Sequence, residues 1–262
     1  NMSDTLFRMA GERQDERMQA VAIATQLDYY YFQGTNEDSV IHYTNKVKEF
    51  AKATHQPKYY YFAWANRLIT YYLKTSRTNI ALYEVQNMLK EAQEEDDKTG
   101  LSRCYNIMSQ IYTIKRFDSM AFEWRLKEIE LTEKYKIENY NISQTYAQIA
   151  NYYINQKKQK EALAAVEKAI ATANSSTQQI SAKLEFVNYY SKFGDFQAAE
   201  KLLKECQAAF EQDKRLESIK KRLYNIECLY YQQTKQYQKA LEAAKMQEKE
   251  ERRLSESILS SI

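Results

Sequence analysis

The sequence predicts an all-α protein, a right-handed solenoid of about six antiparallel helix pairs. The first observation is that the 262 residues include only 4 glycines and 1 proline, whereas average usage would give roughly 18 and 13. Strand-rich folds need both residue types in their turns, so helices with short polar connections are favoured. The second observation is an excess of tyrosine, with 23 residues. The third is that tyrosine and alanine recur periodically.

Aromatic doublets recur at a nearly constant spacing. They are Tyr30-Tyr31, Tyr71-Tyr72, Ile111-Tyr112, Tyr152-Tyr153, Tyr189-Tyr190 and Tyr230-Tyr231. Their second members are 41, 40, 41, 37 and 41 residues apart. A small residue stands nine positions after each second member, at Val40, Ala81, Ala121, Ala162, Ala199 and Ala240. A fixed period of about 20–50 residues is typical of a solenoid. A plain helical bundle rich in tyrosine is the alternative.

Each repeat is interpreted as two helices joined by a short turn. Positions such as Leu68, Ile69 and Tyr72 follow helical spacing, so the first helix ends at the doublet. A few polar residues form the turn, and the alanine is the first inward residue of the second helix. Adjacent tyrosines point about 100° apart on a helix. One can therefore pack on the partner helix and the other on the preceding repeat, so we expect the second tyrosine to be largely buried.

The predicted organisation has three parts. Residues 1–12 form an N-terminal segment with a partial helix, in which Asn1 before Met2 is interpreted as a cloning remnant. Residues 13–250 form a single solenoid of six repeats, and residues 251–262 form a helical extension. An apolar stripe at Leu254, Ile258 and Ile262 follows one face of that extension. It is either a signalling helix that continues into a membrane span beyond residue 262 or a capping helix with a polar outer face.

Composition and motifs favour a protein without catalytic activity. The formal net charge is +3, which argues against a role in wrapping DNA or coating membranes. No stretch of 18 apolar residues exists. His42 and His55 have no neighbours at metal or relay spacing, and the acidic run at positions 94–97 is interpreted as a solvated helix end. We therefore expect no enzyme activity, no catalytic residues, no metal, no cofactor and no nucleic-acid partner in this region.

A candidate binding groove follows from the repeat register. The first helix of every repeat should line the inner face, and residues two, six and nine positions before each second tyrosine should share that face. The candidates are Asn66, Thr70, Arg103, Asn106, Gln110, Gln144, Asn151, Ser181, Asn188, Arg222 and Asn225. Amides donate and accept together, so they can bracket an extended peptide backbone. The alternative is an ordinary wet surface. We expect replacement of Asn106 and Asn151 by leucine to weaken a ligand without unfolding the domain.

The three cysteines match neither a metal site nor a disulfide framework, and they leave the compartment open. In the repeat register, Cys206 lies on the second helix of repeat five and Cys228 on the first helix of repeat six. These two faces should touch, and we expect two buried thiols there rather than a disulfide.

The helix-pair repeat resembles the tetratricopeptide family over residues 13–250. The tyrosine and alanine series carry the resemblance, with the turns at residues 193–199 and 234–240. Gly34 and Gly194 lie where the family often has glycine, and Pro57 lies between repeats. The period averages 40 residues, against about 34 in the family. This long variant is similar to the extracytoplasmic sensor regions of Bacteroidetes two-component histidine kinases and membrane-bound transcription regulators.

The resemblance implies a periplasmic sensor module that binds a peptide, protein or small ligand in its groove. Signalling would run through the last helix, contact with the membrane would be made only by residues outside this chain, and a weak homodimer is expected. The alternative is a cytoplasmic scaffold or adaptor in a multiprotein complex.

Overall fold

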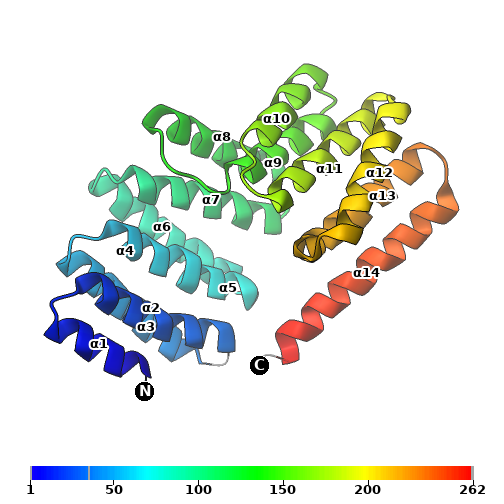
Figure 1. The fold of residues 1–262 in the computed structure, drawn as a ribbon. Helices are drawn as coiled ribbons and strands as arrows, with labels where there is room; N and C mark the ends of the chain where they lie inside the picture. The colour runs from blue at the N-terminus through cyan, green and yellow to red at the C-terminus, as the bar shows by residue number, and fades with distance from the viewer. Residues whose placement is uncertain (1, 35, 261–262) are drawn as a thin grey trace. The chain divides into compact units, whose positions relative to one another are not determined.

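The computed structural model describes residues 2–34 and 36–260, and in these ranges every regular element is a helix. The predicted all-α class is confirmed. The chain from Asn1 to Ile258 forms two compact units, Asn1–Ile137 and Glu138–Ile258. Within each unit, antiparallel helices follow one another along the chain (Figure 1), and consecutive helices up to α13 pack on one another.

The first unit holds the repeats of the first three doublets. Its elements are α1 (Met2–Glu12), α2 (Glu16–Gln33), α3 (Glu37–Ala53), α4 (Pro57–Ala63), η1 (Trp64–Ile69), α5 (Thr70–Lys74), α6 (Thr78–Glu94), α7 (Lys98–Ile114) and α8 (Asp118–Tyr135). The first helices of the repeats are α2, the continuous segment α4–η1–α5, and α7. Their partners are α3, α6 and α8, and α1 packs on α2.

The second unit holds the repeats of the last three doublets. Its elements are α9 (Ile142–Asn155), α10 (Gln159–Ala171), α11 (Ser176–Phe193), α12 (Phe196–Gln212), η2 (Lys214–Ile219), α13 (Lys220–Gln233) and α14 (Tyr237–Ser260). The first helices of these repeats are α9, α11 and α13, and α11 packs on both of the others. A short 3₁₀-helix, η2, precedes α13.

The turns within the repeats share one backbone conformation. In each turn one residue has a positive φ, between 58° and 89°: Gly34, Ser76, Arg116, Lys157, Gly194 and Lys235. In the last five, the carbonyl of the second tyrosine accepts an N–H from the residue five positions later, at 2.8–2.9 Å. This is the Schellman arrangement that ends a helix. Four of the six turns adopt it without glycine, which explains how so few glycines suffice.

The small residue of each repeat lies where the sequence predicts. It is the fourth residue of every second helix, and its N–H donates to the carbonyl just before that helix at 2.9–3.1 Å. Five of the six are fully buried, and Ala240 is 5% exposed. The absence of a large side chain here lets the two helices of a pair approach closely beside their turn.

The prediction that the second tyrosine of each doublet is largely buried is confirmed only in part. Tyr31 and Tyr72 are buried, but the second members of the other four doublets are only half-buried. In the sixth repeat the first member, Tyr230, belongs to the core and Tyr231 packs against its edge. Two adjacent side chains on a helix are buried to different extents, because they point about 100° apart. The doublet spacing does not determine which of them turns inward.

One irregularity lies in the first helix of repeat two. Residues Trp64–Ile69 form a π-helical turn, η1, between α4 and α5. The Thr70 hydroxyl donates to the carbonyl of Ala65, five residues earlier, at 2.9 Å. Neither glycine nor proline is present in the turn, so local sequence does not predict it. π-turns are rare and frequently occur at functional sites, and this one carries the candidate residue Asn66.

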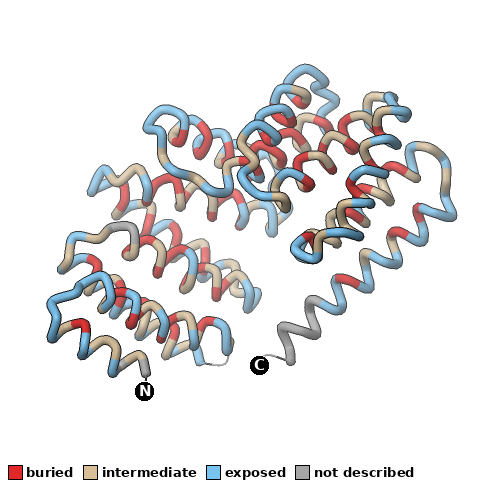
Figure 2. The backbone as a smooth tube through the Cα atoms, in the orientation of Figure 1, coloured by how far each residue is buried: buried red, intermediate tan, exposed pale blue. Residues whose placement is uncertain are grey.

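Burial follows the faces along which neighbouring helices meet (Figure 2). None of the helices that the structure describes is long and apolar enough to cross a membrane. The last helix, α14, is continuous to Ser260, and Lys221 on α13 pairs with Glu251 on α14 at 2.7 Å. The predicted stripe at Leu254, Ile258 and Ile262 lies outside the residues whose side chains are described.

Candidate functional site

In the first unit, the π-turn and α7 are joined by two candidate residues. Arg103 Nη1 donates to Asn66 Oδ1 at 2.6 Å, and Asn66 is otherwise exposed. The Nε of Arg103 is buried and has no hydrogen-bond partner. Burial lowers the pKa of the Arg103 guanidinium below its usual value, although Asp97 acts in the opposite direction. This cation is therefore desolvated and incompletely paired.

Two further candidates in the first unit are organised by a buried carboxylate. Asn106 Nδ2 donates to both oxygens of Glu128 at 3.1 and 3.2 Å, and Glu128 is 1% exposed on α8. Gln110 Nε2 donates to Asn106 Oδ1 at 2.6 Å and remains exposed. Asn106 is thus part of the packing. Its replacement by leucine would remove a donor from a buried carboxylate, which argues against the expectation that this change is structurally neutral.

The second unit contains a larger network around Glu185 on α11. This carboxylate is 1% exposed and accepts hydrogen bonds from Asn151 at 3.2 Å, Asn188 at 2.9 Å and Arg222 at 2.6 Å. The donors come from α9, α11 and α13, so one side chain ties three consecutive first helices together. Asn188 is buried, which removes it from the exposed surface that the sequence predicts.

A small hollow opens beside this network. Its volume is about 120 Å³, and it contains the three candidates that stand nine residues before their second tyrosines: Gln144, Ser181 and Arg222. The remaining wall comes from Ser143, Ala147, Thr177, Gln178, Ala182 and Ile219. The Nε of Arg222 is buried without a hydrogen-bond partner, as in Arg103. These two arginines occupy the same position of their repeats.

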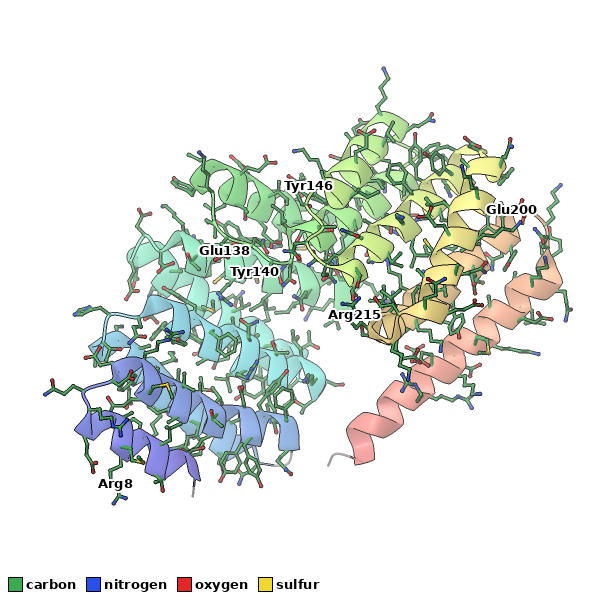
Figure 3. All side chains as sticks on the ribbon, viewed as in Figure 1. Arg8, Glu138, Tyr140, Tyr146, Glu200 and Arg215 are labelled. Carbon is green, nitrogen blue, oxygen red and sulfur yellow. The ribbon has the colours of Figure 1, made fainter. Side chains whose placement is uncertain are left out.

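The segment that leads into the hollow is fixed by Asp213. Its carboxylate accepts hydrogen bonds from the backbone and the guanidinium of Arg215. Arg215 is labelled in Figure 3. Ser176 at the start of α11 donates to the same carboxylate at 3.1 Å. These hydrogen bonds lower the pKa of Asp213 to about 2. They hold η2 against α11 and so set the position of Ile219 in the wall.

The candidates thus separate into distinct groups. Arg103 with Asn66, and Asn106 with Gln110, are joined in the first unit. Asn151, Asn188 and Arg222 are joined in the second through Glu185, and Gln144 and Ser181 line the hollow. Thr70 bonds within its own helix, and Asn225 is exposed on α13 outside both groups.

Sequence reasoning did not find the two carboxylates at the centres of these networks. Glu185 carries only a weak signal, because its apolar neighbours Leu184, Phe186 and Val187 are bounded by Lys183 and Asn188. A charge among apolar residues favours a buried, paired group. Glu128 lies on a second helix among other acidic residues, and the repeat register alone does not distinguish it from them.

The cysteines are free thiols. Cys104 and Cys206 are fully buried, and burial raises the pKa of each to about 12. Cys206 thus matches its prediction, whereas Cys228 is only half-buried and accepts a hydrogen bond from Gln232. Among the described residues, no group of three or more histidine, cysteine or acidic side chains has an arrangement that could hold a metal ion.

Three solved structures are similar to this chain in fold. RapI in its apo form shares 12% identity, with a TM-score of 0.68, over 95% of this chain and 69% of its own. A Rap protein complexed with Competence and Sporulation Factor shares 9%, with a TM-score of 0.60, over 95% and 74%. BtubC from P. vanneervenii shares 14%, with a TM-score of 0.54, over 89% and 92%. No family model matches the chain, and no curated protein matches it in sequence.

At such low identities these likenesses describe the fold alone. They confirm that the chain is an all-α solenoid of helix pairs, and they support the tetratricopeptide-like repeat that the tyrosine and alanine series predict.

Proposed function

We propose that this chain is a non-catalytic binding module that takes an extended peptide, or an extended segment of a partner protein, on the surfaces of its first helices. The observation that carries the proposal is the matched pair of arginines. Arg103 and Arg222 stand nine residues before their second tyrosines, and each keeps a buried Nε–H without an acceptor.

An unpaired buried donor costs about 1–3 kcal/mol. If a rotation of the guanidinium brings this N–H to the surface, a peptide carbonyl or carboxylate oxygen that accepts from it removes that cost, which makes such an atom a favourable ligand. Amide and hydroxyl groups beside each arginine supply further hydrogen bonds: Asn66 in the first unit, and Gln144 and Ser181 in the second. These are the groups that hold a peptide backbone without demanding a particular sequence.

The fold comparisons are consistent with this role. One similar structure is of a Rap protein solved in complex with Competence and Sporulation Factor, so a helical solenoid of this type does bind a separate factor. The first helices of the present chain offer polar, partly exposed surfaces suited to the same use.

The test is to select peptides from a random displayed library on the whole chain and to titrate the selected peptides calorimetrically. Arg103→Lys and Arg222→Lys keep the positive charge but remove the Nε–H, so at least one should weaken binding by about tenfold. Arg252→Lys is the matched control, because Arg252 is exposed on α14. Failure to select any peptide, or equal affinity in all three variants, would contradict the proposal.

We further propose that the module is the extracytoplasmic sensor region of a membrane-anchored bacterial signalling protein, with α14 as its output. The support is the resemblance of the long repeat, together with the continuity of α14 to Ser260. Insertion of one residue after Arg253 would rotate everything downstream by about 100°.

In the full-length protein this insertion should disturb signalling while peptide binding is unchanged. Unchanged signalling would favour a capping helix and the scaffold alternative. The gene region after residue 262 provides a separate test, because an apolar span followed by an output domain is expected there.

A further inference from the structure

A cavity of the first unit lies away from the candidate groove residues. Its volume is about 720 Å³, and it is bounded by the end of α3, the start of α4 and the turn from α6 to α7. A second hollow of about 490 Å³ continues along α6. Lys52, Tyr60 and Glu95 line both. None of the candidate groove residues lines either space.

Aromatic rings form one side of these two hollows: Tyr60 lines both, and Trp64 lines the second. Carboxylates fix the positions of these rings. Tyr60 and Trp64 meet edge to face with centroids 6.0 Å apart. The Tyr60 hydroxyl donates to Glu91, and Trp64 Nε1 donates to Glu84 at 2.8 Å. The hydrogen bonds hold the rings in place and bring negative charge to their edges. Ring faces beside carboxylates attract cations.

Two lysines of the chain already place their ammonium groups on these rings. Lys48 Nζ lies 3.3 Å from the Trp64 ring centroid and 5.0 Å from that of Tyr60. Lys52 Nζ lies 5.5 Å from the Tyr60 centroid, 3.2 Å from Glu91 and 3.6 Å from Glu95. The hydrogen bond to Glu91 raises the pKa of Lys52. These two lysines therefore show that this surface can hold an ammonium group.

The two lysines differ in how easily an external ligand could displace their ammonium groups from the rings. Lys48 lies deeper, and burial lowers its pKa. The Lys52 side chain is 64% exposed, and exposed ion pairs contribute little to stability. An external ammonium could therefore take the place of Lys52 at small cost, while the rest of its carrier occupies the adjoining cavity.

We propose that this cavity binds an alkylammonium group, carried by a lysine side chain of a basic peptide or by a polyamine. The ammonium replaces that of Lys52 between Glu91, Glu95 and the face of Tyr60. The remaining rim also favours a cationic carrier. Its acidic groups are Glu94, Asp96 and Asp97, and its other lysines, Lys90 and Lys98, already pair with Glu94 and Asp96.

The experiment is calorimetric titration of the whole chain with three probes: spermidine, an end-blocked trilysine peptide, and the same peptide acetylated on its side chains. The first two should bind and the third should not, because acetylation removes the charge. Binding by trilysine alone identifies a protein source, and binding by spermidine alone identifies a polyamine. Absence of binding by both overturns the proposal.

A matched pair of variants tests the location. Lys52→Ala removes the internal competitor and should tighten binding by about two- to fivefold. Lys127→Ala changes the net charge equally, but Lys127 is an exposed lysine on α8 that lies over the Trp124 ring and lines neither hollow. It should leave the affinity nearly unchanged. Equal tightening by both variants would show a general charge effect and overturn the site.

A third comparison separates loss of the binding surface from loss of the fold. Tyr60→Phe keeps the ring and loses only the hydroxyl, so ammonium binding should persist. Tyr60→Leu removes the ring face and should weaken binding about tenfold, with circular dichroism confirming the fold. Equal affinity in the Phe and Leu variants would overturn the role of the ring. Neither variant touches the first-helix arginines, so this result is independent of the proposed peptide site.

Discussion

Glu185 shows at the scale of one residue how a buried charge can organise a repeat protein. A carboxylate withdrawn from water is costly unless its oxygens are paired and hydrogen-bonded. Here the two amides and one guanidinium that pair it come from three successive first helices. The same contacts therefore fix the relative positions of α9, α11 and α13 and place Arg222 at the hollow.

Replacement of Glu185 tests this account. Glu185→Gln turns an NH₂ group toward donors and leaves Arg222 without its carboxylate, so the free energy of unfolding should fall by about 1–3 kcal/mol. Glu205→Gln is the control, because Glu205 is 55% exposed where it pairs with Lys183, and surface changes are usually within about 0.5 kcal/mol. Urea denaturation followed by circular dichroism measures both. Similar stability of the two variants would contradict a central role for Glu185.

The thiols give a second prediction at this scale. Burial raises the pKa of Cys104 and Cys206 to about 12, so the protonated form dominates at neutral and mildly alkaline pH and the reactive thiolate is scarce. Iodoacetamide at about pH 8 should therefore label the half-buried Cys228 first, and the other two only after unfolding. Peptide mass spectrometry measures the order. Rapid labelling of Cys206 in the native protein would show that the α12 packing is wrong.

The turn is the decisive element of each repeat. All six have a left-handed residue, yet only Gly34 and Gly194 are glycines. A side chain in this conformation costs about 1–2 kcal/mol, so four turns carry a cost that packing of the flanking helices offsets. Glycine at any of these four positions would avoid this cost and should stabilise the protein.

Two substitutions of opposite sign test the turns. Lys157 has φ 58°, and Lys157→Gly should raise the free energy of unfolding by roughly 0.5–1 kcal/mol. Gly194 has φ +89°, and an added Cβ would meet no atom within 4 Å. Gly194→Ala should therefore lower the free energy of unfolding by roughly 1–2 kcal/mol through backbone strain alone. Thermal denaturation of both variants measures the effect. A stabilising alanine at position 194 would refute the turn geometry.

The sequence predicts elements better than it predicts their interiors. The helix pairs, the turns and the buried alanines follow from a periodic pattern, because the two helices of every repeat pack together at the same sequence positions. The π-turn at Trp64–Ile69 has no such signal, because it has no counterpart in the other described repeats and contains neither glycine nor proline. The repeat register selects the candidate residues, but it does not distinguish exposed Gln110 from buried Asn188, which occupy the same position of their repeats. That difference depends on where Glu128 and Glu185 lie.

At the scale of the whole molecule, the chain resolves into two compact units, each with its own core. One buried cluster runs through α2–α7 and includes Ile69, and another lies among α11, α12 and α13 and includes Leu203. In a solenoid each element contacts mainly its neighbours in the chain, so stability is close to a sum of local terms. Damage to one core should therefore stay local.

Core truncation in each unit tests this locality. Ile69 is fully buried and Leu203 is 2% exposed, and truncation of such side chains to alanine costs about 2–5 kcal/mol. Leu203→Ala should raise amide exchange in α11–α13 while α3–α7 keep their protection, because each repeat is stabilised by its neighbours. Ile69→Ala should give the reverse pattern. Hydrogen–deuterium exchange with mass spectrometry resolves the two regions in one experiment. Equal loss of protection in both units after either substitution would instead show one cooperative folding unit, in which a ligand bound to one set of first helices would stabilise the whole chain.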